Sequence, residues 1–131
     1  MAENKSPIYL KVWFEFHFII DILFAIPLLL FPSEFLELLQ WHTIDPFATR
    51  IVAAALFAIG IESFLGRNAG IETYKNMLNL KIIWSAVVIA GTIFSMIETS
   101  YTNTIAEWLL LLTFLFFNIV WIYWRIRIHN L

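Results

Sequence analysis

Residues 13–23 read WFEFHFIIDIL, an almost continuous apolar run that contains three ionisable side chains, Glu15, His17 and Asp21. All the other residues of the run are large and apolar. In a soluble helix such charges would face water, whereas in a membrane span each must be hidden, paired or used. The solvent in which this stretch folds therefore decides both the fold class and the meaning of the three charges.

The composition of the chain favours the membrane. Of its 131 residues, 61% are hydrophobic and 14% are charged, and the mean hydropathy is +0.81. A soluble domain is about half apolar and about a quarter charged, and a chain of this length has too little interior to bury so much apolar surface. We therefore predict an integral membrane protein whose main partner is the lipid bilayer.

Two classes of function are disfavoured by the same composition. The absence of cysteine excludes disulfides, thiolate metal sites and thiol redox chemistry. The net charge is −2, and no basic patch indicates nucleic acid as a partner.

Four apolar segments approach the length of about 20 residues that a helix needs to cross a bilayer. They cover residues 8–31, 47–65, 77–97 and 105–123. Between the first two, the sequence SEFLELLQW sets two acids three residues apart, Glu34 and Glu37, against apolar residues. This pattern predicts a short amphipathic helix at the outer membrane interface. The predicted fold is all-α: an up-down bundle of four transmembrane helices with one interfacial helix, forming a single domain over residues 1–131.

Local sequence marks several helix ends. Asp45 followed by Pro46 predicts an N-cap and a first-turn proline. Thr104 and Glu107 have the spacing of a capping box. Gly66 predicts a left-handed residue at the end of the second span.

Two surface ion pairs are expected from spacing. Glu15 follows Lys11 by four residues, and Arg50 lies just after Asp45. Close helix packing is expected at small residues four positions apart. These are Ala54 with Ala58, Ala86 with Ala90, and Gly91 with Ser95.

The distribution of basic residues orients the spans. Seven of the eight Lys and Arg residues belong to alternate connections on one side, namely Lys5, Lys11, Arg67, Lys75, Lys81, Arg125 and Arg127. Only Arg50 belongs to the other side, which is otherwise acidic. The positive-inside rule then places both termini in the cytoplasm. We predict a multi-pass protein of the inner (cytoplasmic) membrane of a prokaryote.

Polar residues recur in the cytoplasmic half of the spans. His17 and Asp21 are four residues apart and share a face of the first span. A polar stripe follows the third span, with members Lys81, Ser85, Thr92, Ser95 and Thr99. A charge near the middle of the membrane costs about 2.5–3.5 kcal/mol or more, so these groups should face the bundle interior. The predicted pocket is formed by His17, Asp21, Glu62, Lys81, Ser85 and Asn118.

Three functions suit such a pocket. The preferred hypothesis is that it handles a small ligand, an ion or a proton from the cytoplasmic side. The first alternative is a non-catalytic interaction subunit of a membrane complex, in which the charges form a structural network. The second is a small membrane enzyme with His17 as a general base oriented by Asp21, although no nucleophile is marked and the catalytic residues would be unknown.

No metal site and no cofactor are predicted. Glu15 faces away from His17, and the Glu-x-x-His pairs of di-iron bundles are absent from the sequence. Beyond the bilayer, the candidate partners are a small ligand or cation, a second copy of the chain, or a larger membrane complex.

Three short motifs resemble a known group of proteins. They are LLLFPSEF at the end of the first span (28–35), DPFATR at the start of the second (45–50), and the small-residue run AAALFAIGIES (53–63). In these features and in its layout, the chain resembles small DoxX-like four-span membrane proteins. The resemblance implies the fold. Because some members are named as quinol-oxidase subunits, it also implies that a partner-subunit role is plausible, and it supplies no active-site residues.

Overall fold

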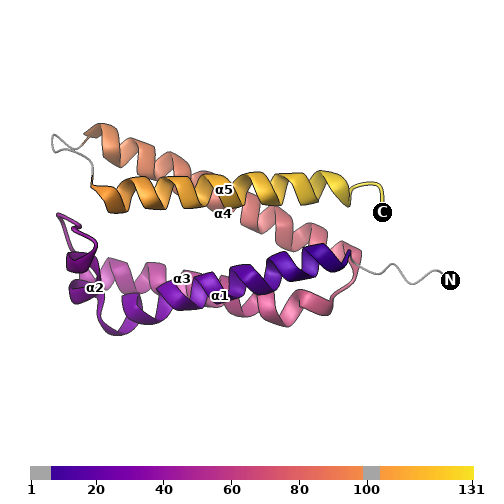
Figure 1. Cartoon of the computed structure of the whole chain (residues 1–131), viewed down its shortest axis with the longest axis horizontal. Helices are drawn as coiled ribbons and strands as arrows, with labels where there is room; N and C mark the ends of the chain where they lie inside the picture. The colour runs from indigo at the N-terminus through magenta and orange to yellow at the C-terminus, as the bar shows by residue number, and fades with distance from the viewer. Residues whose placement is uncertain (1–6, 99–103) are drawn as a thin grey trace. The chain divides into compact units, whose positions relative to one another are not determined.

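The computed structural model describes residues 7–98 and 104–131, and these form helices and short turns with no strand among them. The elements are α1 (Ile8–Leu30), α2 (Pro32–Leu38), α3 (Pro46–Leu65), the 3-10 helix η1 (Gly66–Asn68), α4 (Ile71–Glu98) and α5 (Ile105–Arg127) (Figure 1). Each of the four long segments is long and apolar enough to cross a membrane. The predicted all-α, four-span class is confirmed.

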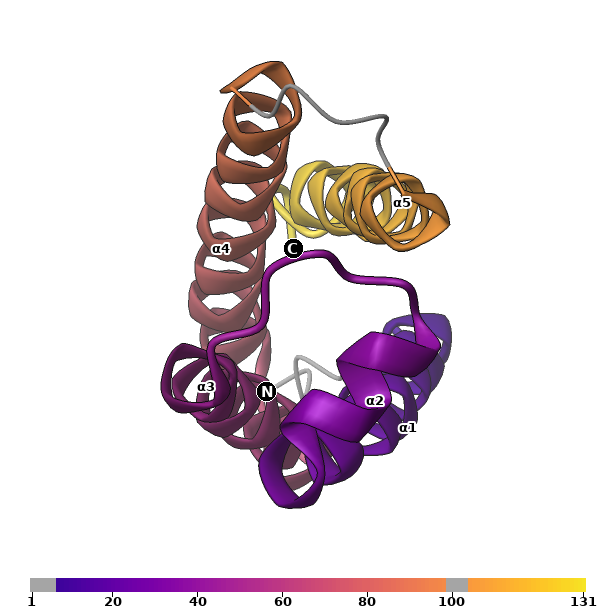
Figure 2. The same ribbon diagram turned by 90° about the vertical axis from the view of Figure 1, so that its left-hand side faces the viewer.

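The chain divides into two compact units, residues 5–70 and residues 71–131. In the first, α1 packs along α3, and α2 lies at one end of this pair (Figure 2). In the second, α4 packs against α5 to form a helical hairpin. The single-domain organisation stays a prediction. Lys5 and Thr99, which belong to the predicted charge bias and polar stripe, lie outside the described residues.

The long helices expose large apolar side chains, and two of them, α1 and α4, carry charges on their buried faces. Leu23, Ile83 and Phe94 are between 62% and 69% exposed, while Asp21 and Lys81 are buried. A soluble helix shows the opposite arrangement, with its charges outside. Together with the four spans, this distribution identifies a multi-pass integral membrane protein in contact with the lipid bilayer.

Buried residues of α1 and α4 follow helical periodicity. On α1 they are Leu10, Phe14, His17, Asp21 and Ala25. On α4 they are Ile71, Tyr74, Met77, Leu78, Lys81 and Ser85. The buried residues of α4 keep a spacing of three or four from Ile71 onward. The helix therefore begins at Ile71, inside the segment that the sequence predicts as a connection, rather than near residue 77.

All three helix ends lie where the sequence predicts them, and only the backbone conformation at Gly66 differs. The Asp45 carboxylate accepts hydrogen bonds from the backbone N–H groups of Phe47 and Ala48, at 3.0 and 3.1 Å. Thr104 and Glu107 form the predicted capping box. Gly66 ends α3 as predicted, but it is not left-handed: its φ is −81°, and the chain continues right-handed into η1.

Both predicted ion pairs have other partners. Arg50 donates from Nε to the carbonyl of Leu29 at 3.1 Å, because the last carbonyls of α1 have no partner within the helix and Asp45 is engaged as a cap. The Glu15 carboxylate lies 3.6 Å from Nε of Arg67 rather than pairing with Lys11.

The small residues buried in the structure are not those of the predicted four-residue steps. Ala54 and Ala58 are exposed, and the buried small residues of α3 are Ala53, Gly60 and Ser63. The predicted steps on α4 are also on its exposed side, at Ala86, Ala90, Gly91 and Ser95. Within each unit the helices therefore do not pack at these steps, and packing there against another helix or a second copy of the chain stays a prediction.

Candidate functional site

His17 and Asp21 form the polar centre of the α1–α3 unit. Both are buried, with 8% and 5% of their surface exposed. Nδ1 of His17 lies 3.0 Å from Oδ2 of Asp21 one turn further along α1. The i, i+4 spacing thus places an imidazole beside a carboxylate in the middle of an apolar helix.

The contact between these two groups is close but poorly aligned. Oδ2 of Asp21 is fully buried and receives no hydrogen bond from any residue that the structure describes. The 3.0 Å separation from His17 is therefore an ion-pair distance without the direction that a hydrogen bond requires. A buried carboxylate oxygen in this condition is costly.

Gly60 on α3 makes room for the Asp21 side chain. A Cβ built at Gly60 would lie 2.8 Å from Cβ of Asp21 and 3.5 Å from its Oδ2. No larger residue fits there without moving one of the helices. The next buried side chain of α3, Ser63, donates its hydroxyl to the carbonyl of Ile59 at 2.8 Å, so the α3 surface at Asp21 brings no titratable group.

Glu62 is not brought to this pair. It is exposed, and it lies about 160° around α3 from Gly60, which is the residue against Asp21. The sequence predicts Glu62 in the pocket because it is a polar residue in the cytoplasmic half of the spans. The structure uses the other side of α3 for close packing.

A second polar cluster lies within the α4–α5 unit. The amide of Asn118 donates to Oγ of Ser85 at 2.8 Å and to the carbonyl of Ile82 at 3.1 Å. Ser85 donates in turn to the carbonyl of Lys81 at 2.7 Å. These bonds link the two helices through an amide whose donors are both used.

Lys81 belongs to the same cluster. It is 3% exposed, and its ammonium lies 5.1 Å from the ring centroid of Trp121 on α5, a cation–π distance. Trp121 stacks on Phe117 with centroids 5.7 Å apart. Further along the predicted stripe, Thr92 donates to the carbonyl of its own helix at Val88, and the stripe is buried only in its first half.

Two contributors to these clusters were missed by the sequence reasoning. Gly60 lies seven residues after Ala53 and three before Ser63, a small-residue spacing that signals one helix face. Trp121 lies three residues after Asn118, so it shares its face. The single pocket predicted from all six polar residues stays a prediction, since His17 and Asp21 belong to one unit and Lys81, Ser85 and Asn118 to the other.

Comparisons with models of protein families, with curated proteins and with solved structures found no match for this chain. The resemblance to DoxX-like proteins stays a prediction.

Proposed function

We propose that this integral membrane protein binds a proton or a small cation at Asp21 and passes it on within the membrane. One observation carries the proposal: a buried carboxylate oxygen that no described group hydrogen-bonds, 3.0 Å from an imidazole nitrogen. Protein interiors rarely leave such an oxygen without a partner. A bound proton or cation would supply that partner.

The neighbouring imidazole suits proton handling. Nδ1 of His17 and Oδ2 of Asp21 are 3.0 Å apart, close enough for a proton to pass between them. The pair therefore supplies a relay of two groups on one face of α1, whose other buried residues are apolar.

Gly60 brings α3 close to Asp21, because a Cβ at this position would lie 2.8 Å from Cβ of Asp21 and 3.5 Å from its Oδ2. In such close packing, a proton is the occupant that needs no movement of the helices. We further propose that the site opens toward the cytoplasmic side of an inner membrane, as the distribution of basic residues predicts, and that Lys81, Ser85 and Asn118 contribute to it.

The test is proton and cation flux in proteoliposomes. Purified protein is reconstituted into vesicles that contain a pH-sensitive dye, and a potassium diffusion potential is imposed with valinomycin. We expect wild type to change the internal pH faster than protein-free vesicles and Asp21→Asn to return the rate to that of protein-free vesicles. Glu62→Gln is the matched control, because it removes an exposed carboxylate from the same unit and should retain the flux.

Two outcomes would contradict the proposal. One is wild-type vesicles that match empty ones under proton, sodium, potassium and ammonium gradients alike. The other is a flux that Asp21→Asn leaves intact. Either outcome would favour the alternative of an interaction subunit whose charges have a structural role.

A further inference from the structure

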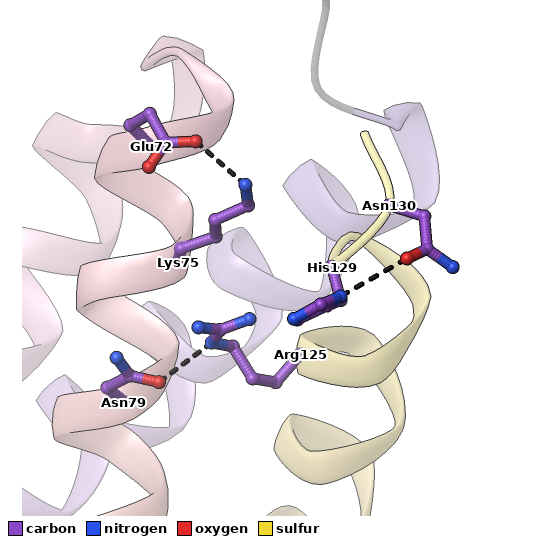
Figure 3. A network of polar contacts seen from close by, with 6 residues as sticks. All are labelled: Glu72, Lys75, Asn79, Arg125, His129 and Asn130. Carbon is purple, nitrogen blue, oxygen red and sulfur yellow. Dashed lines mark hydrogen bonds and ion pairs between the residues drawn. The ribbon is translucent and has the colours of Figure 1, made fainter.

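The end of the α4–α5 hairpin contains an open recess, far along the sequence from Asp21. It is a hollow of about 390 Å³ lined by Asn79, Arg125, Ile126, His129 and Asn130. Figure 3 shows four of these residues, all but Ile126. Four of these five side chains carry hydrogen-bonding groups, and two of the four are basic residues. None of them takes part in the function proposed above.

Arg125 is held in position by the neighbouring helix. Its Nε donates to Oδ1 of Asn79 at 2.7 Å. This bond uses one edge of the guanidinium, so the two terminal amino groups retain donors for a further acceptor. A guanidinium oriented in this way binds phosphate with paired hydrogen bonds.

His129 is positioned on the other side of the recess. Its Nδ1 lies 3.2 Å from Oδ1 of Asn130, and Figure 3 shows the other ring nitrogen on the side of Arg125. In the imidazolium form, Nδ1 donates to Asn130 and Nε2 is available to an anion. The nearby acid Glu72 is already paired with Lys75 at 2.7 Å, which limits its repulsion of a bound anion.

The length and composition of α5 predict that the recess lies at the depth of lipid headgroups. α5 has 23 residues, or about 35 Å of helix, whereas the hydrocarbon core is about 30 Å thick. Arg125 is in the last turn of α5, directly after Tyr123 and Trp124. Aromatic residues at the end of a span mark the membrane–water interface, and basic pockets between spans at this level bind anionic headgroups.

We propose that this recess is a binding site for a phosphate group, carried by an anionic lipid headgroup or by a soluble phosphate. Arg125 is the cationic donor, and the His129 ring and the side-chain amide of Asn130 are the further donors. Asn79 is a positioning residue, because it holds the guanidinium without reaching the anion itself.

The experiment measures lipid retention by native mass spectrometry. Protein in detergent is equilibrated with equal amounts of phosphatidylglycerol and phosphatidylcholine, and the adducts are counted. We expect wild type to retain phosphatidylglycerol preferentially and both Arg125→Gln and His129→Gln to lose that preference. Arg127→Gln is the matched control. Arg127 lies two residues after Arg125 and carries the same charge, but its side chain does not line the recess. Asn79→Ala keeps every charge and should weaken the preference less than Arg125→Gln.

A second arm identifies the source of the phosphate. Inorganic phosphate is titrated against protein in phosphatidylcholine nanodiscs while the His129 ring resonances are followed. Saturable shifts that Arg125→Gln abolishes would support a soluble ligand, and lipid preference without such shifts would support a headgroup. The proposal is overturned by no lipid preference together with no shifts, or by Arg127→Gln acting as strongly as Arg125→Gln.

Discussion

Asp21 on α1 and Gly60 on α3 are packed so closely that a single added carbon would collide: a Cβ at Gly60 would lie 2.8 Å from Cβ of Asp21. Real Cβ atoms do not approach so closely, and the obstructing atom is attached to the backbone of α1. The buried carboxylate therefore depends on a glycine of the neighbouring helix for its place.

This contact predicts opposite effects for two Gly→Ala substitutions. Gly60→Ala should destabilise the fold by about 1–3 kcal/mol, since overpacking outweighs the gain in helix propensity. Gly91→Ala, on α4, meets nothing within 4 Å and should stabilise by about 0.5–1 kcal/mol. Unfolding followed by circular dichroism in mixed micelles measures both. Effects of the same sign would show that the close approach at Gly60 is not the determining factor.

Asp21→Asn separates a functional carboxylate from a structural one. If the charge holds the fold together, removing one member of a buried ion pair should cost about 3–5 kcal/mol. We expect a change below about 1 kcal/mol, because Oδ2 has no hydrogen bond to lose among the described residues. Unfolding titrations give the value. Glu62→Gln, at an exposed position, should stay within about 0.5 kcal/mol of wild type.

The α4–α5 hairpin should depend on the bond between Asn118 and Ser85. Asn118→Ala is expected to cost about 0.6–1.7 kcal/mol, which runs from the average to the maximum found for hydrogen bonds between membrane helices. Combined with Ser85→Ala, the loss should be less than the sum of the single losses, because both variants break the same 2.8 Å contact. Thr92→Ala serves as the control, since Thr92 bonds only its own helix at Val88 in the contacts described. If the losses caused by Asn118→Ala and Ser85→Ala add in full, the hydrogen bond between these two side chains does not hold the helices together.

The pocket predicted from sequence requires Asp21 and Lys81 to act together. A double-mutant cycle with Asp21→Asn and Lys81→Gln tests this requirement on both flux and stability. Groups that share one site should give a coupling energy of about 0.5–3 kcal/mol. A coupling near zero would limit the site to α1 and α3 and leave Lys81 with its partner Trp121.

The four spans, the Asp45 cap and the Thr104 capping box could be predicted because each depends on residues close together in sequence. A run of about 20 apolar residues must be helical in lipid wherever it packs, since every backbone group needs a partner within the segment. A cap needs only a side chain within three residues of the N–H groups that it satisfies. The proximity of His17 to Asp21 was predictable for the same reason, since the two are four residues apart and share one face of α1.

The partners across helices were decided by tertiary structure alone. Sequence reasoning chose Ala54 and Ala58 as the packing face of α3, whereas Gly60 is the residue against Asp21. A helix that is apolar all round has no polar side to show which way it turns, so small residues on several faces look equally suitable. For the same reason the partners of Glu15 and Arg50 proved to be Arg67 and the Leu29 carbonyl. Local sequence sets which segments are helices and which charges share a helix face, because backbone hydrogen bonding and the 3.6-residue period both act over a few residues. Only the packed structure decided which face of each helix meets its neighbour, because that depends on contacts between residues far apart in the chain.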